Sequence, residues 1–224
     1  MTIYEWLPVF RNCIKNTVRY VTISAPTYTD NAFMPVNQRL LKSIPHWVEA
    51  DHAALLHLEQ DVSSWLLDSS SLTQRIKEYC DRCSQGSFGV KVINQGMDFP
   101  SPDECFRLHI KGRRFALIRE VLLYCGNLPL IYARTVIPST TLTGAQKQLA
   151  LQGNRPLGAF LFAQPDLQRD ALELAVVHEG QQLYDLAVGH ASLRTDHINA
   201  RRSIFRLHDK PLLVAELFLP TIFA

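Results

Sequence analysis

Hydrophobic and polar residues alternate through the middle of the chain, and short apolar runs continue this pattern toward its C-terminal end. Seven such runs are found, at residues 88–97, 105–111, 115–124, 128–137, 171–178, 200–207 and 211–219. Glycines at 112 and 126 mark turns between the runs of the first group. Successive side chains in a β-strand point to opposite faces of a sheet, so a period of two predicts a strand in the alternating runs, and the nearly continuous apolar run at 211–219 predicts a strand covered on both faces.

Helical spacing is found on both sides of the first strands. From about Ala53, apolar residues recur at intervals of three and four, as on the buried face of a helix. Ser71 is a suitable cap for a second helix, because its side-chain oxygen can accept a hydrogen bond from a free backbone amide. Residues 140–162 predict further helix with Thr143 as a cap, whereas 179–199 show no clear pattern.

Strands that follow one another without a helix between each pair indicate an α+β fold rather than strict alternation of strand and helix. We therefore expect a single domain, an antiparallel β-sheet with flanking helices, over residues 39–224. Residues 1–38 contain three prolines and several β-branched residues, and we interpret them as an N-terminal extension of unknown role.

The composition narrows the class of protein. The 224 residues suffice for one sizeable domain, and 47% hydrophobic with 20% charged residues is typical of a globular protein. A net charge of +2 gives no reason to expect a nucleic-acid or membrane-surface partner. No apolar run is long enough for a membrane helix, and the first residues do not resemble a secretory signal. Five cysteines, an odd number, favour a reducing, cytoplasmic location over a disulfide framework.

Metal and cofactor sites are not predicted. The eight histidines form neither His-x-x-x-His nor Glu-x-x-His, and Cys80 with Cys83 lacks further ligands at short spacing. We interpret these two cysteines as thiols at the end of a helix. Signatures of a serine nucleophile or of a phosphate-binding loop are also missing. The arginines at 201, 202 and 206 are interpreted as a solvated face rather than a basic patch.

Two charged residues stand out because they lie within the most apolar strands. Arg119 shares its face of the 115–124 strand with Leu117, Val121 and Leu123. The 211–219 strand is apolar on both faces, as in a covered central strand, except for Glu216. Burial of a guanidinium without a partner costs several kcal/mol. Burial likewise raises the pKa of a carboxyl such as Glu216 unless a cation or a hydrogen-bond donor offsets it.

These two charges permit two interpretations. In the structural one, Arg119 and Glu216 pair with each other, or with Arg134, as a buried salt bridge. In the functional one, both line a pocket in the sheet. Arg119 would then bind a substrate carboxylate through two hydrogen bonds, and Glu216 would be a buried acid, base or hydroxyl acceptor.

Short blocks of sequence between about residues 55 and 220 resemble, in order, the chorismate pyruvate-lyase family, also called 4-hydroxybenzoate synthases. Two of them are Leu-Ile-Arg-Glu-Val-Leu-Leu at 117–123 and Lys-Pro-Leu-Leu-Val-Ala-Glu-Leu-Phe-Leu-Pro at 210–220. The others lie at 65–67 with 71–75, 133–138, 141–144, 155–158 with 161–162, and 200–203.

The resemblance implies an antiparallel α+β domain that eliminates pyruvate from chorismate and leaves 4-hydroxybenzoate for quinone biosynthesis, without a metal or an organic cofactor. The family's carboxylate-binding arginine falls on Arg119, and its buried glutamate, near the product hydroxyl, falls on Glu216. Backbone amides that help bind the product fall on Leu157, at the carboxylate end, and on Leu72, at the hydroxyl end. Residues 1–38 and the stretch from 178 to 199 depart from short members of the family.

An alternative function is that of a non-catalytic domain that binds a small aromatic carboxylate as a sensor. A similar fold serves as the effector domain of some bacterial transcription regulators. Those proteins carry an N-terminal winged-helix DNA reader, and residues 1–38 are too short and too poor in basic helical segments to form one.

Overall fold

The computed structural model describes residues 43–223, and the predicted N-terminal extension at 1–38 therefore lies outside the described residues. Eight strands form one antiparallel sheet, seven of them in the order β1-β6-β7-β8-β4-β3-β2, with β5 paired to β7. Their bounds are β1 Val48–Glu49, β2 Phe88–Asp98, β3 Ala116–Cys125, β4 Leu128–Pro138, β5 Gln168–Arg169, β6 Glu173–His178, β7 His197–Leu207 and β8 Lys210–Phe218. This sheet and its helices confirm the predicted α+β class.

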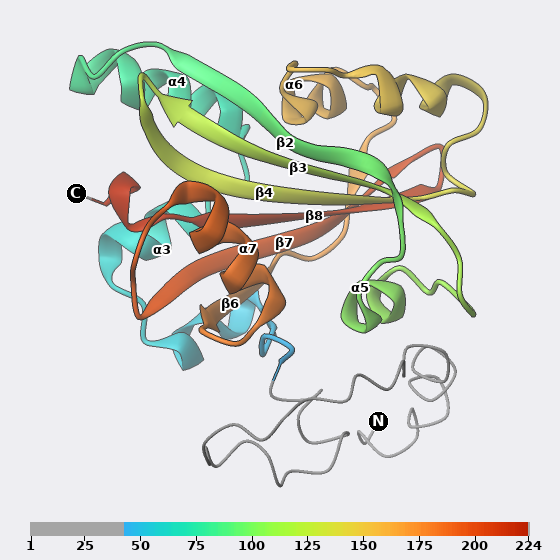
Figure 1. Cartoon of the computed structure of the whole chain (residues 1–224), viewed down its shortest axis with the longest axis horizontal. Coiled ribbons are helices and arrows are strands. Elements are labelled where there is room, and N and C mark those ends of the chain that lie inside the picture. Colours follow the sequence, from blue (N-terminus) through green and yellow to red (C-terminus); the bar gives the residue numbers. More distant parts are fainter. Residues whose placement is uncertain (1–42, 224) are drawn as a thin grey trace, which may run out of the picture.

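Helices cover both faces of the sheet. Figure 1 shows α4 and α6 above the sheet, with α5 and α7 below it. The α-helices are α3 Gln60–Leu66, α4 Leu72–Cys83, α5 Pro102–Arg107, α6 Leu157–Phe162 and α7 Gln182–Ala191. The 3₁₀ helices are η3 Ala50–Leu56, η4 Gly144–Leu151 and η5 Pro220–Ile222. Within residues 43–223, no helix has the length and apolar composition needed to cross a bilayer.

Successive residues of β3 pack on different faces of the sheet. Val121 belongs to the core cluster of Trp65 and Ile76, which lies under α3 and α4. Leu122 belongs to the cluster of Tyr184, which lies under α7. A strand that is buried on both faces accounts for the nearly continuous apolar sequence of 116–125.

On the face covered by α5, Arg134 is surrounded by buried acceptors. Its Nε donates to Oε1 of Glu104 and its Nη1 donates to Oε1 of Glu120, both at 2.7 Å. Tyr132 donates its hydroxyl to the same Glu120 oxygen at 2.7 Å. Burial acts to raise the pKa of Glu120, but the Tyr132 hydrogen bond and the Arg134 charge outweigh it and hold this pKa below its usual range. Arg134 is therefore not available to Glu216 on the other face.

The strand predicted at 105–111 is wrong, because α5 occupies its first residues. Ser101 accepts a hydrogen bond from the backbone of Glu104, whose side chain accepts one from the backbone of Ser101. This capping box, followed by Pro102 in the first helical turn, starts a helix. The helix buries Cys105 and leaves Phe106 40% exposed.

The predicted helices are present but are divided differently. The helical pattern from Ala53 is split into η3 and α3 by His57, whose φ of 49° is left-handed. Residues 140–162 hold η4 and α6, and Thr143 precedes η4 without forming the predicted side-chain cap. The unassigned stretch 179–199 contains α7. The prediction that Cys80 and Cys83 lie at a helix end is confirmed, because both are in the last turn of α4.

The interpretation of Arg201 and Arg202 as a solvated face is wrong. Their exposed fractions are 2% and 5%. Arg202 donates to Asp103 at 2.6 Å and to Glu173 at 2.9 Å on the α5 side of the sheet, whereas Arg201 points to the other face. Partly buried carboxylates thus offset the Arg202 charge, which the sequence pattern could not show.

Candidate active site

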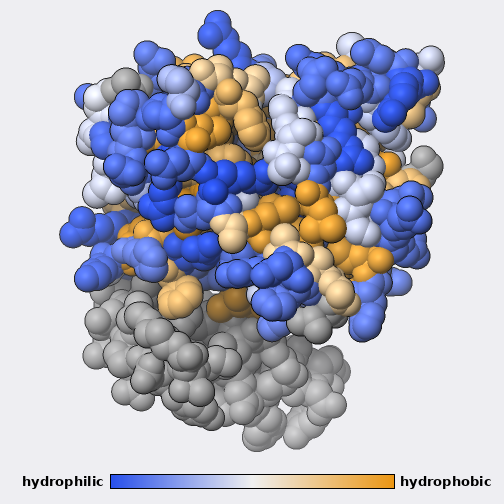
Figure 2. All heavy atoms as spheres, turned by 180° about the vertical axis from the view of Figure 1, so that it is seen from behind, coloured by the Kyte–Doolittle hydropathy of each residue, from blue (hydrophilic) through white to orange (hydrophobic). Residues whose placement is uncertain are grey.

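The four residues predicted for the site line one pocket on the face of the sheet that α4 and α6 cover. Leu72 and Leu157 come from these two helices, Arg119 from β3 and Glu216 from β8. Seen from behind, hydrophobic residues form one area in the upper part of the molecule and a second in its middle, with a band of hydrophilic residues between them (Figure 2). The other pocket residues are Ser70, Thr73, Val90, Val121, Leu123, Ala133, Thr135, Pro156, Gly158, Leu161, Phe162, Arg169, Arg201, Phe205 and Val214.

Two rows of side chains cross the floor of the pocket from β3 to β7. The first row is Arg119, Thr135, Val214 and Ser203. The second row, two residues along each strand and on the same face, is Val121, Ala133, Glu216 and Arg201. Neighbouring strands lie about 4.8 Å apart, so Arg119 and Glu216, two strands from each other, are separated by about 10 Å across the sheet.

Arg119 is a buried cation without a carboxylate partner in residues 43–223. Only 2% of it is exposed. Nη1 donates to Oε1 of Gln95 at 3.1 Å, and Nη2 donates to the carbonyl oxygen of Arg155 at 3.0 Å. Burial lowers the pKa of Arg119. A guanidinium has five N–H donors, so donors remain for an anion, which would also offset the cost of burying the charge.

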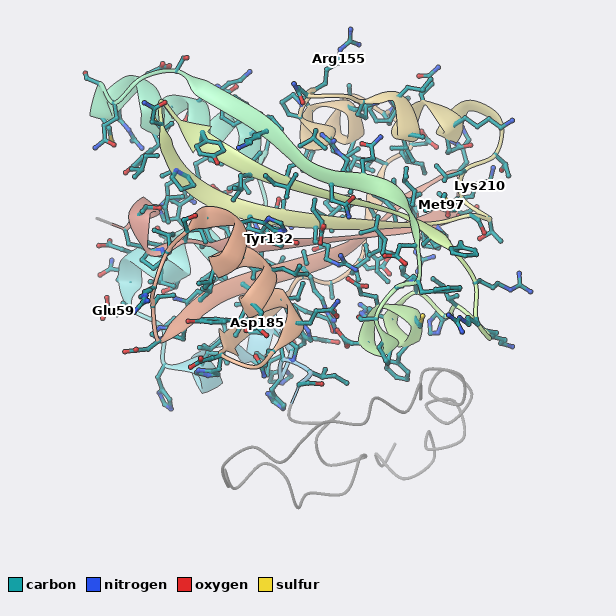
Figure 3. All side chains as sticks on the ribbon, in the orientation of Figure 1. Glu59, Met97, Tyr132, Arg155, Asp185 and Lys210 are labelled. Carbon is teal, nitrogen blue, oxygen red and sulfur yellow. The ribbon has the colours of Figure 1, made fainter. Side chains whose placement is uncertain are left out.

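The backbone before α6 places Leu157 beside this cation. The side chain of Arg155 points away from the molecule, as Figure 3 shows, while its carbonyl oxygen accepts from Arg119. Leu157, two residues later, is the first residue of α6. The first amides of a helix have no acceptor within their own helix, so the N–H of Leu157 is available to a ligand that Arg119 also binds.

At the other end of the pocket, Glu216 pairs with Arg201. The Nε of Arg201 donates to Oε2 of Glu216 at 2.6 Å, and its Nη1 donates to the carbonyl oxygens of Trp65 and Leu66 at the end of α3. The structural interpretation, in which Arg119 and Glu216 pair with each other or with Arg134, is therefore wrong. Arg201 is the cation that offsets the buried carboxylate, and no hydrogen bond to the second oxygen, Oε1, is formed by the part of the chain described.

Leu72 is the first residue of α4, next to this second end. Ser71 caps the helix as predicted, since its side chain accepts from the backbone of Gln74. The N–H of Leu72 has no acceptor in its own helix, and the N-terminal end of α4 carries a partial positive charge. The structure thus brings the four predicted residues together in two pairs, one at each end of the pocket, while their roles stay predictions.

Sequence reasoning missed two arginines of the pocket, Arg169 and Arg201. Arg201 alternates with Ser203 and Phe205 on β7, so its place on a partly apolar face was a usable signal. Arg169 lies in the two-residue strand β5, which is too short to leave a periodic pattern. Among residues 43–223, no group of three or more His, Cys, Asp or Glu side chains is arranged to hold a metal ion.

Comparison with known proteins identifies a family model and several relatives that match this chain. A family model described as "Chorismate lyase" matches residues 41–224. A relative in Methylococcus capsulatus, named "Probable chorismate pyruvate-lyase", is 39% identical over 161 residues, which cover 72% of this chain and 96% of that protein. One of the same name in Nitrosospira multiformis is 34% identical, covering 76% and 93%. Among solved structures, a GntR-family transcriptional regulator from Bacillus cereus aligns with a TM-score of 0.45 at 13% identity, covering 59% of this chain and 92% of that one.

Proposed function

This chain belongs to the chorismate lyase family, and from that premise we propose that it eliminates pyruvate from chorismate and leaves 4-hydroxybenzoate. The observation that carries the proposal is Arg119, a buried cation with no carboxylate partner in the described chain, in one pocket with Glu216. A stable fold rarely keeps such a charge without an anionic ligand. Chorismate and 4-hydroxybenzoate both supply a ring carboxylate.

The reaction itself is redox-neutral. The ether C–O bond at ring carbon 3 breaks, and the enolpyruvyl oxygen leaves with the bonding electrons. The hydrogen on carbon 4, which bears the hydroxyl, is lost as a proton, and its C–H electrons complete the aromatic ring. The enolate takes up a proton and becomes pyruvate. Because aromatisation drives the reaction, positioning and electrostatic stabilisation are what the protein has to add.

The two ends of the pocket match the two ends of the ring. Arg119 and the backbone N–H of Leu157 bind the ring carboxylate, because the amide and the guanidinium N–H groups that Gln95 and Arg155 leave free can donate to its two oxygens. At the opposite end, Oε1 of Glu216 accepts the hydrogen bond of the ring hydroxyl, and the backbone N–H of Leu72 donates at the same end. Arg201 holds Glu216 in place through the 2.6 Å hydrogen bond to its other oxygen.

We extend the proposal to pathway and location. 4-Hydroxybenzoate from this reaction would supply the aromatic ring for quinone biosynthesis, and the reaction would take place in the cytoplasm. The free thiols of Cys80, Cys83 and Cys125 support a reducing compartment.

Incubation of the purified full chain with chorismate tests the function directly. We expect pyruvate and 4-hydroxybenzoate to be formed in equal amounts, with pyruvate followed by a coupled dehydrogenase and 4-hydroxybenzoate by chromatography. A chorismate solution without protein is the control for spontaneous breakdown. Binding of chorismate or 4-hydroxybenzoate without any conversion would contradict the proposal and favour the alternative of an aromatic-carboxylate sensor.

A further inference from the structure

Arg169 is a second arginine of the pocket that no carboxylate of the described chain pairs with. Its Nε donates to Oγ of Ser203 at 3.0 Å, and its Nη1 donates to the carbonyl oxygen of Ser69 at 3.3 Å. Its Cζ lies 5.2 Å from the centroid of the Phe205 ring. These partners fix the position of the guanidinium, but all of them are neutral, so none of them offsets its charge.

The contacts of Arg169 place it at the Glu216 end of the pocket, away from Arg119. Ser203 lies on β7, three strands from β3, in the floor row that starts at Arg119. Glu216 and Arg201 are in the neighbouring row, on β8 and β7. Burial lowers the pKa of Arg169, and the charge of Arg201 lowers it further, while Glu216 and Asp68 act in the opposite direction. The guanidinium is thus partly desolvated and close to the charges around Glu216.

Chorismate differs from 4-hydroxybenzoate by the enolpyruvyl group, which carries a second carboxylate. This group is attached to ring carbon 3, next to the carbon that bears the hydroxyl. When the ring carboxylate is at Arg119 and the hydroxyl is at Glu216, the second carboxylate lies at the Glu216 end. The residues at that end of the pocket therefore have to bind a second carboxylate as well as the ring hydroxyl.

We propose that Arg169 binds the enolpyruvyl carboxylate of chorismate, an assignment that rests on the proposed function. Arg201 is less suited to this task, because its charge is already offset by Glu216, which accepts from its Nε at 2.6 Å, whereas no carboxylate of the described chain pairs with Arg169. Arg169 keeps its Nη2 free of hydrogen bonds to the described chain. Chorismate then binds to both Arg119 and Arg169, whereas 4-hydroxybenzoate binds to Arg119 alone. Arg169 therefore favours the substrate over the product.

The test compares affinity for chorismate with affinity for 4-hydroxybenzoate in the variant Arg169→Gln. A hydrogen-bonded charge pair of this kind corresponds to a 10- to 100-fold effect, roughly, so we expect the KM for chorismate to rise by about that factor. The Kd of 4-hydroxybenzoate should change by less than about threefold, because the product lacks the second carboxylate. Arg169→Lys keeps the charge but not the planar fork, and an intermediate KM is expected.

Arg206→Gln is the matched control, since it removes one positive charge next to β5 but outside the pocket, where Arg206 pairs with Asp170 at 2.9 Å. We expect its KM to equal that of the wild type. An unchanged KM in Arg169→Gln would overturn the proposal, as would an equal loss of affinity for substrate and product, which indicates a structural role. If the wild type does not convert chorismate, the proposed function fails, and equilibrium Kd values for chorismate then decide the role of Arg169 by the same comparison.

Discussion

Replacing Arg119 with methionine is expected to lower kcat/KM for chorismate by about 100- to 1000-fold and to weaken 4-hydroxybenzoate binding by a similar factor. Loss of one partner of a desolvated charge pair costs about 2–5 kcal/mol, and each 1.4 kcal/mol is about tenfold in affinity. Methionine fills much of the space of the arginine stem, so the change removes chiefly the charge and its donors. Steady-state kinetics and an equilibrium titration of the product measure the two effects.

The same variant should be at least as stable as the wild type. Arg119 has only neutral partners, Gln95 and the carbonyl of Arg155, so its removal leaves no buried carboxylate without a cation. We expect an unchanged or higher Tm, which would separate the loss of activity from loss of the fold. Near-normal turnover in a folded Arg119→Met protein would contradict the role of Arg119 as the carboxylate anchor.

Arg134→Met, in contrast to Arg119→Met, is expected to lower the stability of the fold. This change leaves Glu104 and Glu120 buried without their cation, with side chains only 7% and 4% exposed. Breaking a buried pair in this way costs about 3–5 kcal/mol. For a chain of this size each kcal/mol lowers Tm by about 2–4 °C, so a fall of about 6–20 °C is expected in thermal unfolding.

The loss of stability in Arg134→Met should depend on pH. In the wild type the Tyr132 hydrogen bond and the Arg134 charge hold the pKa of Glu120 below its usual value of 4.5, against the effect of burial. The corresponding stability is complete above that usual value and is lost as pH falls through the lower, folded pKa. The difference in Tm between wild type and variant should therefore be largest near pH 7 and shrink at about pH 4. A difference that stays constant or grows on acidification would contradict this account of the network.

Arg119 and Glu216 show what the sequence could and could not reveal. A period of two places Arg119 on an apolar face and Glu216 in a strand that is buried on both faces, so both were recognisable as buried charges. Their partners were not, because the pairing of Arg201 with Glu216 depends on how β7 and β8 align. For this reason the sequence left open a bridge between Arg119 and Glu216, which the structure does not form.

Short elements account for the other errors. The segment from Cys105 alternates like a strand, yet the capping box formed by Ser101 and Glu104 starts a six-residue helix there. That signal is visible in the sequence, but it competes with the alternation. Arg169 gave no signal, since it lies in a strand of two residues and reaches the pocket only through tertiary packing.

The recognition of the ligand carboxylate by Arg119 is the central claim, and one thermodynamic cycle tests it most directly. It uses the Kd values of 4-hydroxybenzoate and of its neutral methyl ester, each measured with wild type and with Arg119→Met. The wild type should prefer the acid by about 30-fold or more, and the variant by less than about threefold, because only the wild type offers the acid a buried cation. An equal preference for the acid in both proteins would show that the carboxylate is bound elsewhere, and would contradict the account.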